Sequence, residues 1–554
     1  MEKALSAYSY EHIERYFNDV KANGLTEHGF PRLTSNMGIL IADGRRRDLL
    51  PIFLEMMEFC CKTIPTVKAA NDFSVREIVC CIRELEASDA VEKCDIERWK
   101  GYLATIVPTE CYTIFVNTVD DTAFWNNWAL FTGVSEYFRR SIVSCDNLDF
   151  IDVQLEYNLR CFDENGMYMD NGSSDVHQPT MYDIVPRGLY SLLLNEGYRG
   201  RLYDKIDATI KKAALLTLKM QSPNGEIAFG GRSNQMLNNE AWLALIYEYE
   251  AKRYKNEGNM ALVKEFKAAA DRALTALEYW LSKTPIRHVK NRFSTETKFG
   301  CENYAYFDKY MITVASFLYA AYLVCDESIP TEKLPDTAPC AWQTSYHFHK
   351  LFLKAGGYGL EFDLNASRHY DANGLGRVHK IGAPSAICLS CPCPPANASY
   401  TVDIEEPFAF SACSVIKRDG NLIFGAEETC KYEVISTAEE RDLASAVLSC
   451  RFPDGTELTE KYSVSDKGVD IAIEGDEEIG YALPALCFDG ETRPYINCTK
   501  NTLTISYEGY TCRYTTNGKI TDLGRITANR NGHYRAFVAS ADKNLSVKIE
   551  IVKE

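Results

Sequence analysis

The chain has 554 residues, of which 46% are hydrophobic and 12% aromatic, so it holds more core-forming material than one domain needs. It has 60 lysine and arginine residues against 77 aspartate and glutamate residues, and this formal net charge of -17 argues against nucleic acid as a partner. The same charge repels a long polyanion and therefore favours a short acidic oligosaccharide. No apolar run is long enough to span a bilayer, so we predict no membrane partner; a homo-oligomer stays open.

The first residues of the chain and its cysteines indicate the cellular compartment and whether a metal is expected. The first residues, MEKALSAYSYEHIERYFNDV, lack the basic and apolar regions of a cleaved signal peptide. The twenty cysteines are scattered at apolar positions such as Cys60 and Cys325, where a thiol packs as a small hydrophobic group, so we predict a cytoplasmic protein. Cys388, Cys391 and Cys393 have a spacing that zinc sites use, but no matched second pair follows. We predict no metal and no other cofactor.

The first 335 residues read as a series of helices separated by polar loops, because apolar residues recur there at spacings of three and four. Predicted helices cover residues 47–64, 128–143, 150–162, 260–283 and 309–325. Such a series can form an open solenoid or a closed α/α toroid. No fixed repeat length of the solenoid kind is present, which favours the toroid.

A second domain, residues 336–554, is predicted beyond a proline-bearing segment, SIPTEKLPDTAPCAW. Short stretches of alternating polar and apolar residues follow it, and dipeptides that favour tight hairpins separate them. These dipeptides are Asp419-Gly420, Asp454-Gly455, Lys467-Gly468 and Asn517-Gly518. We therefore expect antiparallel hairpins that together form a β-sandwich.

Polar and aromatic loops interrupt the helical half at NGMYMDNGSSDVHQPTMYDIVP and GEIAFGGRSNQMLNNEAW, and an Asn-Asn-Trp run lies upstream of both. Their chemically active side chains are Asn126, Asn127, Trp128, Asp170, His177, Tyr182, Arg232 and Asn234. Histidine, tyrosine, arginine and asparagine are the types needed to remove a proton from a carbon next to a carboxylate. We expect a carbohydrate-active site here.

The order of these residues resembles polysaccharide lyases of the chondroitin AC/hyaluronate lyase and heparinase II/III-like group. In the first of these, an Asn-Trp pair precedes a Gly-aromatic-Asp-Gly-Ser segment ending in His, then a Tyr and a Gly-Arg-x-x-x-Arg loop. This chain offers Asn127-Trp128, residues 166–173 leading to His177 and Tyr182, and Gly231-Arg232-Ser233-Asn234. The interval from His to Tyr is shorter here, and the second Arg is missing. The resemblance implies an α/α toroid followed by a β-sandwich, and a lyase reaction.

An elimination next to a uronate carboxylate requires hydrogen-bond donors or positive charge on that carboxylate, because the neighbouring proton is otherwise too weakly acidic. Asn126, Asn127 and Arg232 can supply them. His177 or a tyrosinate would then remove the proton. Tyr182 would protonate the departing glycosidic oxygen, and one hydroxyl can accept and return a proton on the same face.

Two further clusters are predicted to contact the substrate. The run FSTETKFGCENYAYFDKYM precedes an apolar helix and could wall the sugar site with aromatic rings. The glycine-rich run SRHYDANGLGRVHKIGAPSA at the entry to the sandwich is expected to form a loop that reaches over the toroid mouth. The substrate-binding residues predicted in addition to the catalytic ones are Asn126, Trp128, Asp170, Asn234, Glu302, Tyr304, Tyr306, Arg377 and His379.

Each key residue also has a purely structural interpretation. His177 could be a hydrogen-bonding loop residue, and Asn126 or Asn127 could cap the helix that follows. Arg232 could be a turn residue placed by the two glycines before it, and Tyr182 a packed aromatic. Glu302 has the position of an acidic residue at a helix start, which the helix dipole favours.

Three functions follow in order. The first is a uronate lyase that cleaves a glucuronate-type glycosidic bond by β-elimination and leaves a 4,5-unsaturated uronate. The second is a glycoside hydrolase that uses two carboxylates about 5–9.5 Å apart, drawn from Asp170, Asp175, Glu240 and Glu302. The third is a non-catalytic carbohydrate-binding protein, in which His177, Tyr182 and Arg232 would not converge on one cleft.

Overall fold

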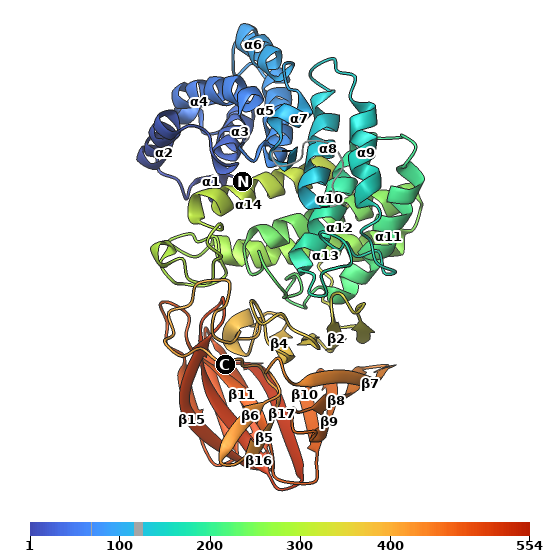
Figure 1. The fold of residues 1–554 in the computed structure, drawn as a ribbon, viewed down its shortest axis with the longest axis vertical. Helices are drawn as coiled ribbons and strands as arrows, with labels where there is room; N and C mark the ends of the chain where they lie inside the picture. Colours follow the sequence, from blue (N-terminus) through green and yellow to red (C-terminus); the bar gives the residue numbers. More distant parts are fainter. Residues whose placement is uncertain (68, 116–125) are drawn as a thin grey trace.

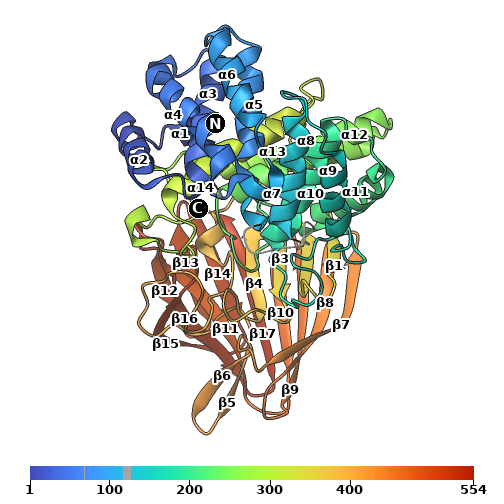
Figure 2. The same cartoon turned by 45° about the horizontal axis from the view of Figure 1, so that its top comes forward.

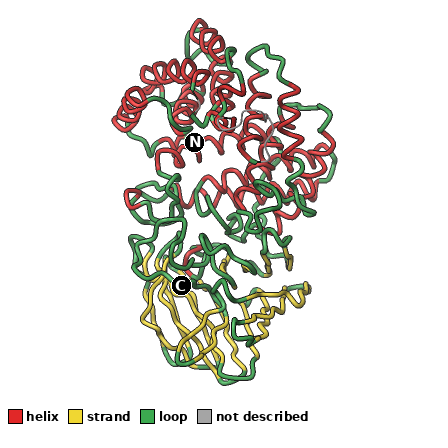
Figure 3. The backbone as a smooth tube through the Cα atoms, viewed as in Figure 1, coloured by secondary structure: helices red, strands yellow, loops and turns green. Residues whose placement is uncertain are grey.

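The computed structural model describes residues 1–67, 69–115 and 126–554. Helices occupy residues 2–324 and gather in one half of the molecule, while strands occupy residues 340–553 and form the other half (Figures 1 and 3). This confirms a helical region followed by an antiparallel β region. The last helix ends at Val324 and the first strand begins at Cys340, so the boundary predicted at residue 335 falls in the connecting segment.

The helical half is a double ring. The inner helices are α3 (Gly29–Ala42), α5 (Val75–Glu86), α8 (Asn127–Arg139), α10 (Thr180–Asn195), α12 (Asn238–Asn256) and α14 (Phe307–Val324). Each packs against the next in this order, and α14 returns to α3, so the ring closes as the sequence predicts for a toroid. The outer helices are α2 (Tyr10–Asn23), α4 (Leu50–Thr63), α6 (Lys93–Leu103), α9 (Leu148–Asn158), α11 (Tyr203–Met220) and α13 (Met260–Leu281). Short helices and 3-10 turns complete the half: α1 (Glu2–Leu5), α7 (Pro108–Cys111), η1 (Arg47–Leu49), η2 (Ile64–Thr66), η3 (Asn71–Phe73), η4 (Thr113–Phe115) and η5 (Thr295–Thr297).

The distribution of apolar residues around each helix explains whether the helix lies in the inner or the outer ring. The outer helix α2 buries Ile13, Phe17 and Val20, spaced four and three residues apart, and leaves its other faces polar. The inner helix α14 is apolar almost all round, because neighbours surround it on both sides. The five helices predicted above are confirmed as α4, α8, α9, α13 and α14, with ends that differ from the predicted ones by at most four residues.

The β half contains three antiparallel sheets. An eight-stranded sheet has the order β12-β13-β14-β17-β10-β9-β8-β7, a five-stranded sheet the order β15-β16-β11-β5-β6, and a four-stranded sheet the order β1-β2-β3-β4. Burial alternates along strands of the large sheet, such as β9, so one face is buried against the smaller sheets. The strands are β1 (Cys340–Gln343), β2 (Lys350–Ala355), β3 (Tyr358–Asp363), β4 (Gly374–Lys380), β5 (Ser414–Arg418), β6 (Asn421–Phe424), β7 (Lys431–Glu440), β8 (Leu443–Arg451), β9 (Glu457–Ser465), β10 (Gly468–Glu474), β11 (Ile479–Phe488), β12 (Tyr495–Cys498), β13 (Thr502–Tyr507), β14 (Tyr510–Thr516), β15 (Lys519–Ala528), β16 (His533–Ala541) and β17 (Asn544–Lys553), with η6 (Ser385–Ile387) between β4 and β5.

Three of the four predicted hairpin turns are confirmed. Asp419-Gly420 joins β5 to β6, and Asp454-Gly455 lies between β8 and β9. Lys467 lies in the turn from β9 to β10, and Gly468 is the first residue of β10. Asn517-Gly518 instead carries the chain from β14 in the large sheet to β15 in the five-stranded sheet, so the predicted hairpin is wrong. The same turn chemistry can serve either connection, and here the strand after the turn pairs with β16.

The run SRHYDANGLGRVHKIGAPSA differs from the loop predicted for it. Its centre, Gly374–Lys380, is strand β4, which pairs with β3. Six of the seven β4 residues are buried, since the four-stranded sheet lies between the toroid and the large sheet (Figure 2). Residues placed on β4 therefore pack at the domain junction.

The remaining sequence predictions concern cysteines and membranes. All twenty cysteines lie in the described ranges and are free thiols, most of them buried. Over those same ranges, no helix combines the length and the apolar character that crossing a membrane requires.

Candidate active site

A cavity of about 460 Å³ opens at one end of the helical ring. Its size is typical of ligand pockets. Its walls come from α3, η3, α8, α10, α12 and α14 and from the loops before α10, α12 and α14. The predicted site residues that line it are Asn126, Asn127, Trp128, Asp170, Tyr182, Arg232 and Tyr304.

The inner helices present their amino-terminal ends to this cavity. Its lining includes His28 at the start of α3, Asn127 on α8, Tyr182 on α10, Asn238 on α12 and residues of the first two turns of α14. A helix amino terminus carries unpaired N–H groups and partial positive charge, so several such ends favour an anionic ligand. The local field therefore opposes the overall negative charge of the chain.

Asp170 connects the two sides of the site that the sequence predicts. Its Oδ1 accepts hydrogen bonds of 3.0 Å from both the backbone N and the side-chain Nδ2 of Asn127. Its Oδ2 lies 3.2 Å from the Arg232 guanidinium. Burial raises the pKa of Asp170, and the bonds from Asn127 and the charge of Arg232 oppose that rise. Asn126 caps α8, with its side chain accepting from Ala129 N at 3.1 Å, while also lining the cavity.

Tyr182 lies under the Arg232 guanidinium, whose central carbon is 4.4 Å from the ring centroid. Burial raises the pKa of Tyr182, while the positive charge of Arg232 and a hydrogen bond with Ser233 lower it. The Ser233 hydroxyl also lies 2.9 Å from the Tyr304 hydroxyl, and Tyr310 lines the same wall. Two tyrosine hydroxyls and a serine hydroxyl thus share one hydrogen-bonding cluster beside a cation.

The loop that carries Arg232 has an unusual backbone. Gly231 has a φ of 73°, and a Cβ built there would lie 2.7 Å from Pro179 Cβ, so glycine is required sterically at position 231. Ser233 and Gln235 also have left-handed φ values, 58° and 60°. Such residues cost about 1–3 kcal/mol each and cluster at functional sites. The surrounding contacts must therefore hold this loop in place.

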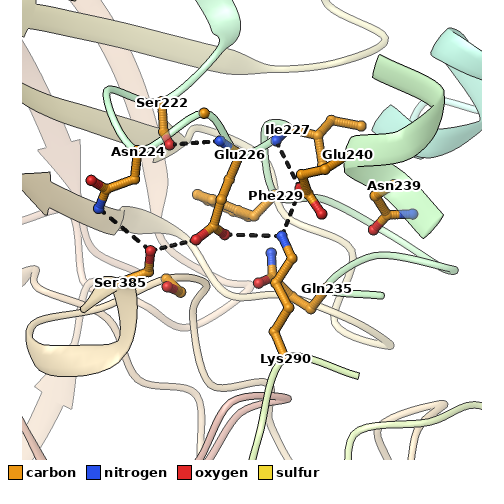
Figure 4. A network of polar contacts seen from close by, with 12 residues as sticks. Ser222, Asn224, Glu226, Ile227, Phe229, Gln235, Asn239, Glu240, Lys290 and Ser385 are labelled. Atoms are coloured by element: carbon orange, nitrogen blue, oxygen red, sulfur yellow. Dashed lines mark hydrogen bonds and ion pairs between the residues drawn. The ribbon is translucent and has the colours of Figure 1, made fainter. Parts of the chain in front are cut away.

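A buried polar network provides one of those contacts (Figure 4). Lys290 Nζ lies 2.6 Å from Glu240 on α12 and 3.0 Å from Glu226 in the loop. Burial alone would raise the pKa of Glu226, but the charge of Lys290, with that of Arg377 and a hydrogen bond from Ser385, lowers it to about 2. Burial raises the pKa of Glu240. Through its ion pair with Lys290, Glu240 helps to hold the loop in place, and it does not line the cavity.

Glu302 and Asn234 also hold the loop. Glu302 accepts from Ser233 N at 2.7 Å and forms a buried ion pair with Arg530 of the β half, 2.7 Å apart. Asn234 donates from Nδ2 to Thr180 Oγ1 at 3.1 Å and to Ala228 O at 3.0 Å. Tyr306 is the N-cap residue of α14 and is half-buried outside the lining.

Arg377 and His379 lie on β4, away from the cavity. Arg377 donates from Nη1 to Ile227 O at 2.6 Å and pairs with Glu361 at 3.1 Å. His379 Nε2 lies 3.0 Å from Ser390 Oγ, and burial lowers the His379 pKa to about 3. Arg377 thus joins the β half to the loop that precedes α12, whereas His379 bonds within the β half.

His177 lies at the domain junction and does not line the cavity. Its ring centroid is 5.5 Å from that of His349, whose Nδ1 is 2.5 Å from Asp363. Burial, followed by the charge of His349, lowers the pKa of His177. Its backbone N donates to Asp175, so Asp175 also serves the loop. The structure thus brings Tyr182, Arg232, Asn127 and Asp170 together without His177.

The sequence predictions missed one wall of the cavity. His28 and Arg32 on α3, Asn238 on α12 and Thr313 on α14 line it without belonging to any predicted set. Arg32 lies in the otherwise apolar run GFPRLTSNMGILIA, where an arginine surrounded by core residues is the only signal available.

Comparison with known proteins gives structural likenesses at low sequence identity. No model of a known protein family matches the chain, and no curated protein matches its sequence. The chain is similar to a heparinase III structure, with 11% identity, a TM-score of 0.48, and coverage of 95% of this chain and 78% of that one. It is also similar to the Streptomyces coelicolor A3 chondroitin AC lyase in complex with chondroitin sulphate, with 10% identity, a TM-score of 0.48 and coverage of 94% and 74%. A glycosyl hydrolase family 88 structure from Bacteroides vulgatus has 10% identity, a TM-score of 0.35 and coverage of 58% and 98%.

Proposed function

We propose that the protein is a lyase that cleaves a uronate-containing oligosaccharide by β-elimination. The observation that supports this most is the placement of Tyr182 beneath Arg232 in a cavity whose described lining contains a single carboxylate, Asp170. Elimination needs a proton-transfer group next to positive charge, whereas hydrolysis needs a carboxylate pair. Polar donors and helix amino termini around the cavity suit an acidic substrate.

The proposed reaction starts with a uronate whose carboxylate lies beside Arg232 and Asn126. Tyr182, ionised with the help of Arg232, removes the proton on C5, and the electron pair of that bond forms the C4–C5 double bond. The bond from C4 to the glycosidic oxygen breaks, and the Tyr182 hydroxyl returns its proton to that oxygen. The products are a 4,5-unsaturated uronate and a shortened saccharide. Tyr182 thus acts as base and as acid.

The hydrolase alternative is less well supported by the same geometry. Glu240 is paired with Lys290, Glu302 is paired with Arg530, and Asp175 accepts a bond from the backbone of His177. None of these three carboxylates lines the cavity opposite Asp170. A binding protein without catalysis is less consistent with Tyr182 and Arg232 in one cleft.

The test is enoate absorbance in the ultraviolet during incubation with a panel of uronate-containing oligosaccharides. Tyr182→Phe should lower the rate by about 10²–10⁴-fold, because it removes the transferable proton. Tyr203→Phe is the matched control. Tyr203 lies on the outer helix α11, and the central carbon of the Arg199 guanidinium is 4.5 Å from its ring centroid. That variant should keep the wild-type rate.

Other results would change the proposal in defined ways. New reducing ends without enoate would replace elimination with hydrolysis. A loss in His177→Ala as large as in Tyr182→Phe would assign the base to His177.

A further inference from the structure

The wall of the cavity formed by His28, Arg32, Lys309 and Thr313, which we name the α3 wall, holds unused positive charge. Arg32 is 2% exposed and its Nε lies 3.0 Å from Glu77. Arg76, equally buried, also pairs with Glu77 at 3.2 Å. Two buried arginines therefore share the one carboxylate of Glu77. A buried charge in excess is costly unless a ligand of opposite charge approaches it.

Unpartnered polar atoms lie on the same wall and beside it. Arg32 donates from Nη1 to Thr313 at 2.8 Å, but none of the described residues accepts a hydrogen bond from Arg32 Nη2. His28 Nδ1 and Asn238 Oδ1 are also buried without a partner among the described residues. These three side chains are more than nine-tenths buried, and all of them line the cavity. Buried polar groups in native proteins nearly always have partners, so an absent ligand is the natural one.

The position of the α3 wall separates it from the reacting groups. In the ring order α3-α5-α8-α10-α12-α14, helix α3 is three places from α10, so it faces Tyr182 across the cavity. Phe73 lies between His28 and Trp128, with ring centroids 4.9 Å from each. Phe317, which lines the cavity from α14, packs on the fully buried Trp242 of α12, with ring centroids 4.1 Å apart. The cavity thus has an anion-attracting side opposite its proton-transfer side.

We propose that the α3 wall is a second subsite, which binds the carboxylate of a sugar acid other than the sugar that undergoes elimination. Arg32 Nη2 and His28 Nδ1–H would donate to the carboxylate, and Asn238 Oδ1 would accept from a hydroxyl of the same sugar. The inference rests on the proposed function only in taking a saccharide as the ligand. It narrows the substrate to one with acidic groups on two sugar units.

The test is calorimetric titration of the intact protein with glucuronate, glucose and acetate. Glucuronate should bind more tightly than either of the others, because it has both the carboxylate and the hydroxyls. His28→Asp adds a negative charge at an N-cap position, where aspartate is well tolerated, and should weaken glucuronate binding by about tenfold or more. Asn303→Asp adds the same charge at an exposed residue outside the cavity and should leave binding unchanged.

Two more variants place the bound carboxylate. Arg32→Lys keeps the charge beside Glu77 but loses the unpartnered Nη2, so it should also weaken glucuronate binding. In Arg232→Gln, whose reacting subsite has lost its cation, the glucuronate binding that remains should weaken further when Arg32→Lys is added. Equal affinity for glucose or acetate, or a loss confined to Arg232→Gln, would overturn the proposal. Because glucuronate has no glycosidic bond, its binding is measured whether or not elimination occurs, so the two proposals can fail separately.

Discussion

Arg232 is the residue through which the predicted site is held together. It contacts the carboxylate of Asp170 at 3.2 Å and stacks on the Tyr182 ring at 4.4 Å, while its side chain stays 37% exposed. The planar guanidinium can make both contacts at once, which the point charge of a lysine cannot. Its charge also lowers the pKa of Tyr182 against the effect of burial. Arg232 therefore serves the chemistry of Tyr182 as well as the carboxylate of a substrate.

Replacing this residue tests both roles. In Arg232→Met the pKa of Tyr182 should rise, because the charge that lowers it is gone. If Tyr182 ionises to act, the rise of kcat/KM with pH should move to higher pH, and the rate near pH 7 should fall by about 10²-fold.

The control for this change is Arg201→Met. Arg201 is 52% exposed and pairs with Glu156 at 2.7 Å on the outer ring, remote from the cavity. Its loss should leave the pH profile unchanged. An unshifted profile in Arg232→Met would show that Tyr182 does not ionise during the reaction.

At the scale of elements, the loop between α11 and α12 is the part of the fold that places the chemistry. It spans residues 221–237 and is held from three directions. Lys290 fastens it to Glu226 and Glu240, Glu302 accepts from Ser233 N, and Glu361 of β3 accepts from Phe229 N at 3.1 Å. The left-handed residues of the loop persist because these contacts outweigh their strain.

Removing the central cation should destabilise this element. Lys290→Met leaves Glu226 and Glu240 buried without a counter-charge, which costs about 3–5 kcal/mol. Thermal unfolding should show a clear fall in Tm. Lys219→Met, on the exposed side of α11, is the control and should leave Tm unchanged.

A compensating variant tests the physical reason. Changing Glu226 and Glu240 to Gln in the Lys290→Met background removes the uncompensated charges and should restore most of the lost stability. No recovery in that triple variant would mean that Lys290 stabilises the loop through packing and not through charge.

At the scale of the whole molecule, the architecture was largely predictable because it follows from local periodicity. Apolar spacing identifies α4, α8, α9, α13 and α14, and turn dipeptides identify three hairpins of the β half. The pairing of distant segments is not encoded locally, so Asn517-Gly518 was assigned to a hairpin although it crosses between sheets. Strand β4 was missed because its glycines and polar residues resemble a loop, and only packing against the toroid buries them.

The candidate site also has a part that the sequence predicts and a part that it does not. Its α8, α10 and Arg232 components could be predicted, because polar residues in a loop between apolar helices stand out. His28 and Arg32 of the α3 wall could not, since they become part of the site only when the ring closes and brings α3 opposite α10. Conversely, Arg377 and His379 look like ligands in sequence but are buried at the domain junction, where Arg377 bonds to Ile227 O of the helical half and His379 to Ser390 of the β half.

That junction makes the whole molecule sensitive to acid. Burial lowers the pKa of His379 to about 3 and that of His288, on the toroid side, to about 4, so both are neutral when folded. In the unfolded chain each takes up a proton near its ordinary pKa of about 6.5. Above about pH 6.5 the two histidines therefore do not reduce the free energy of unfolding. As the pH falls toward 4 and 3, that free energy decreases by up to about 1.4 kcal/mol per pH unit for each histidine.

His379→Gln isolates this effect, because glutamine can keep a hydrogen bond with Ser390 but cannot take up a proton. Between pH 7 and pH 5 the Tm of this variant should fall less than the Tm of the wild-type protein. His369→Gln, at an exposed position, should fall as the wild type does. Burial also raises the pKa of Glu361 to about 7, which acts in the opposite direction over the same range, but this contribution is common to all three proteins and cancels in the comparison. Parallel Tm curves for wild type and His379→Gln would show that His379 takes up its proton without unfolding, and that the junction admits a charge that its burial should exclude.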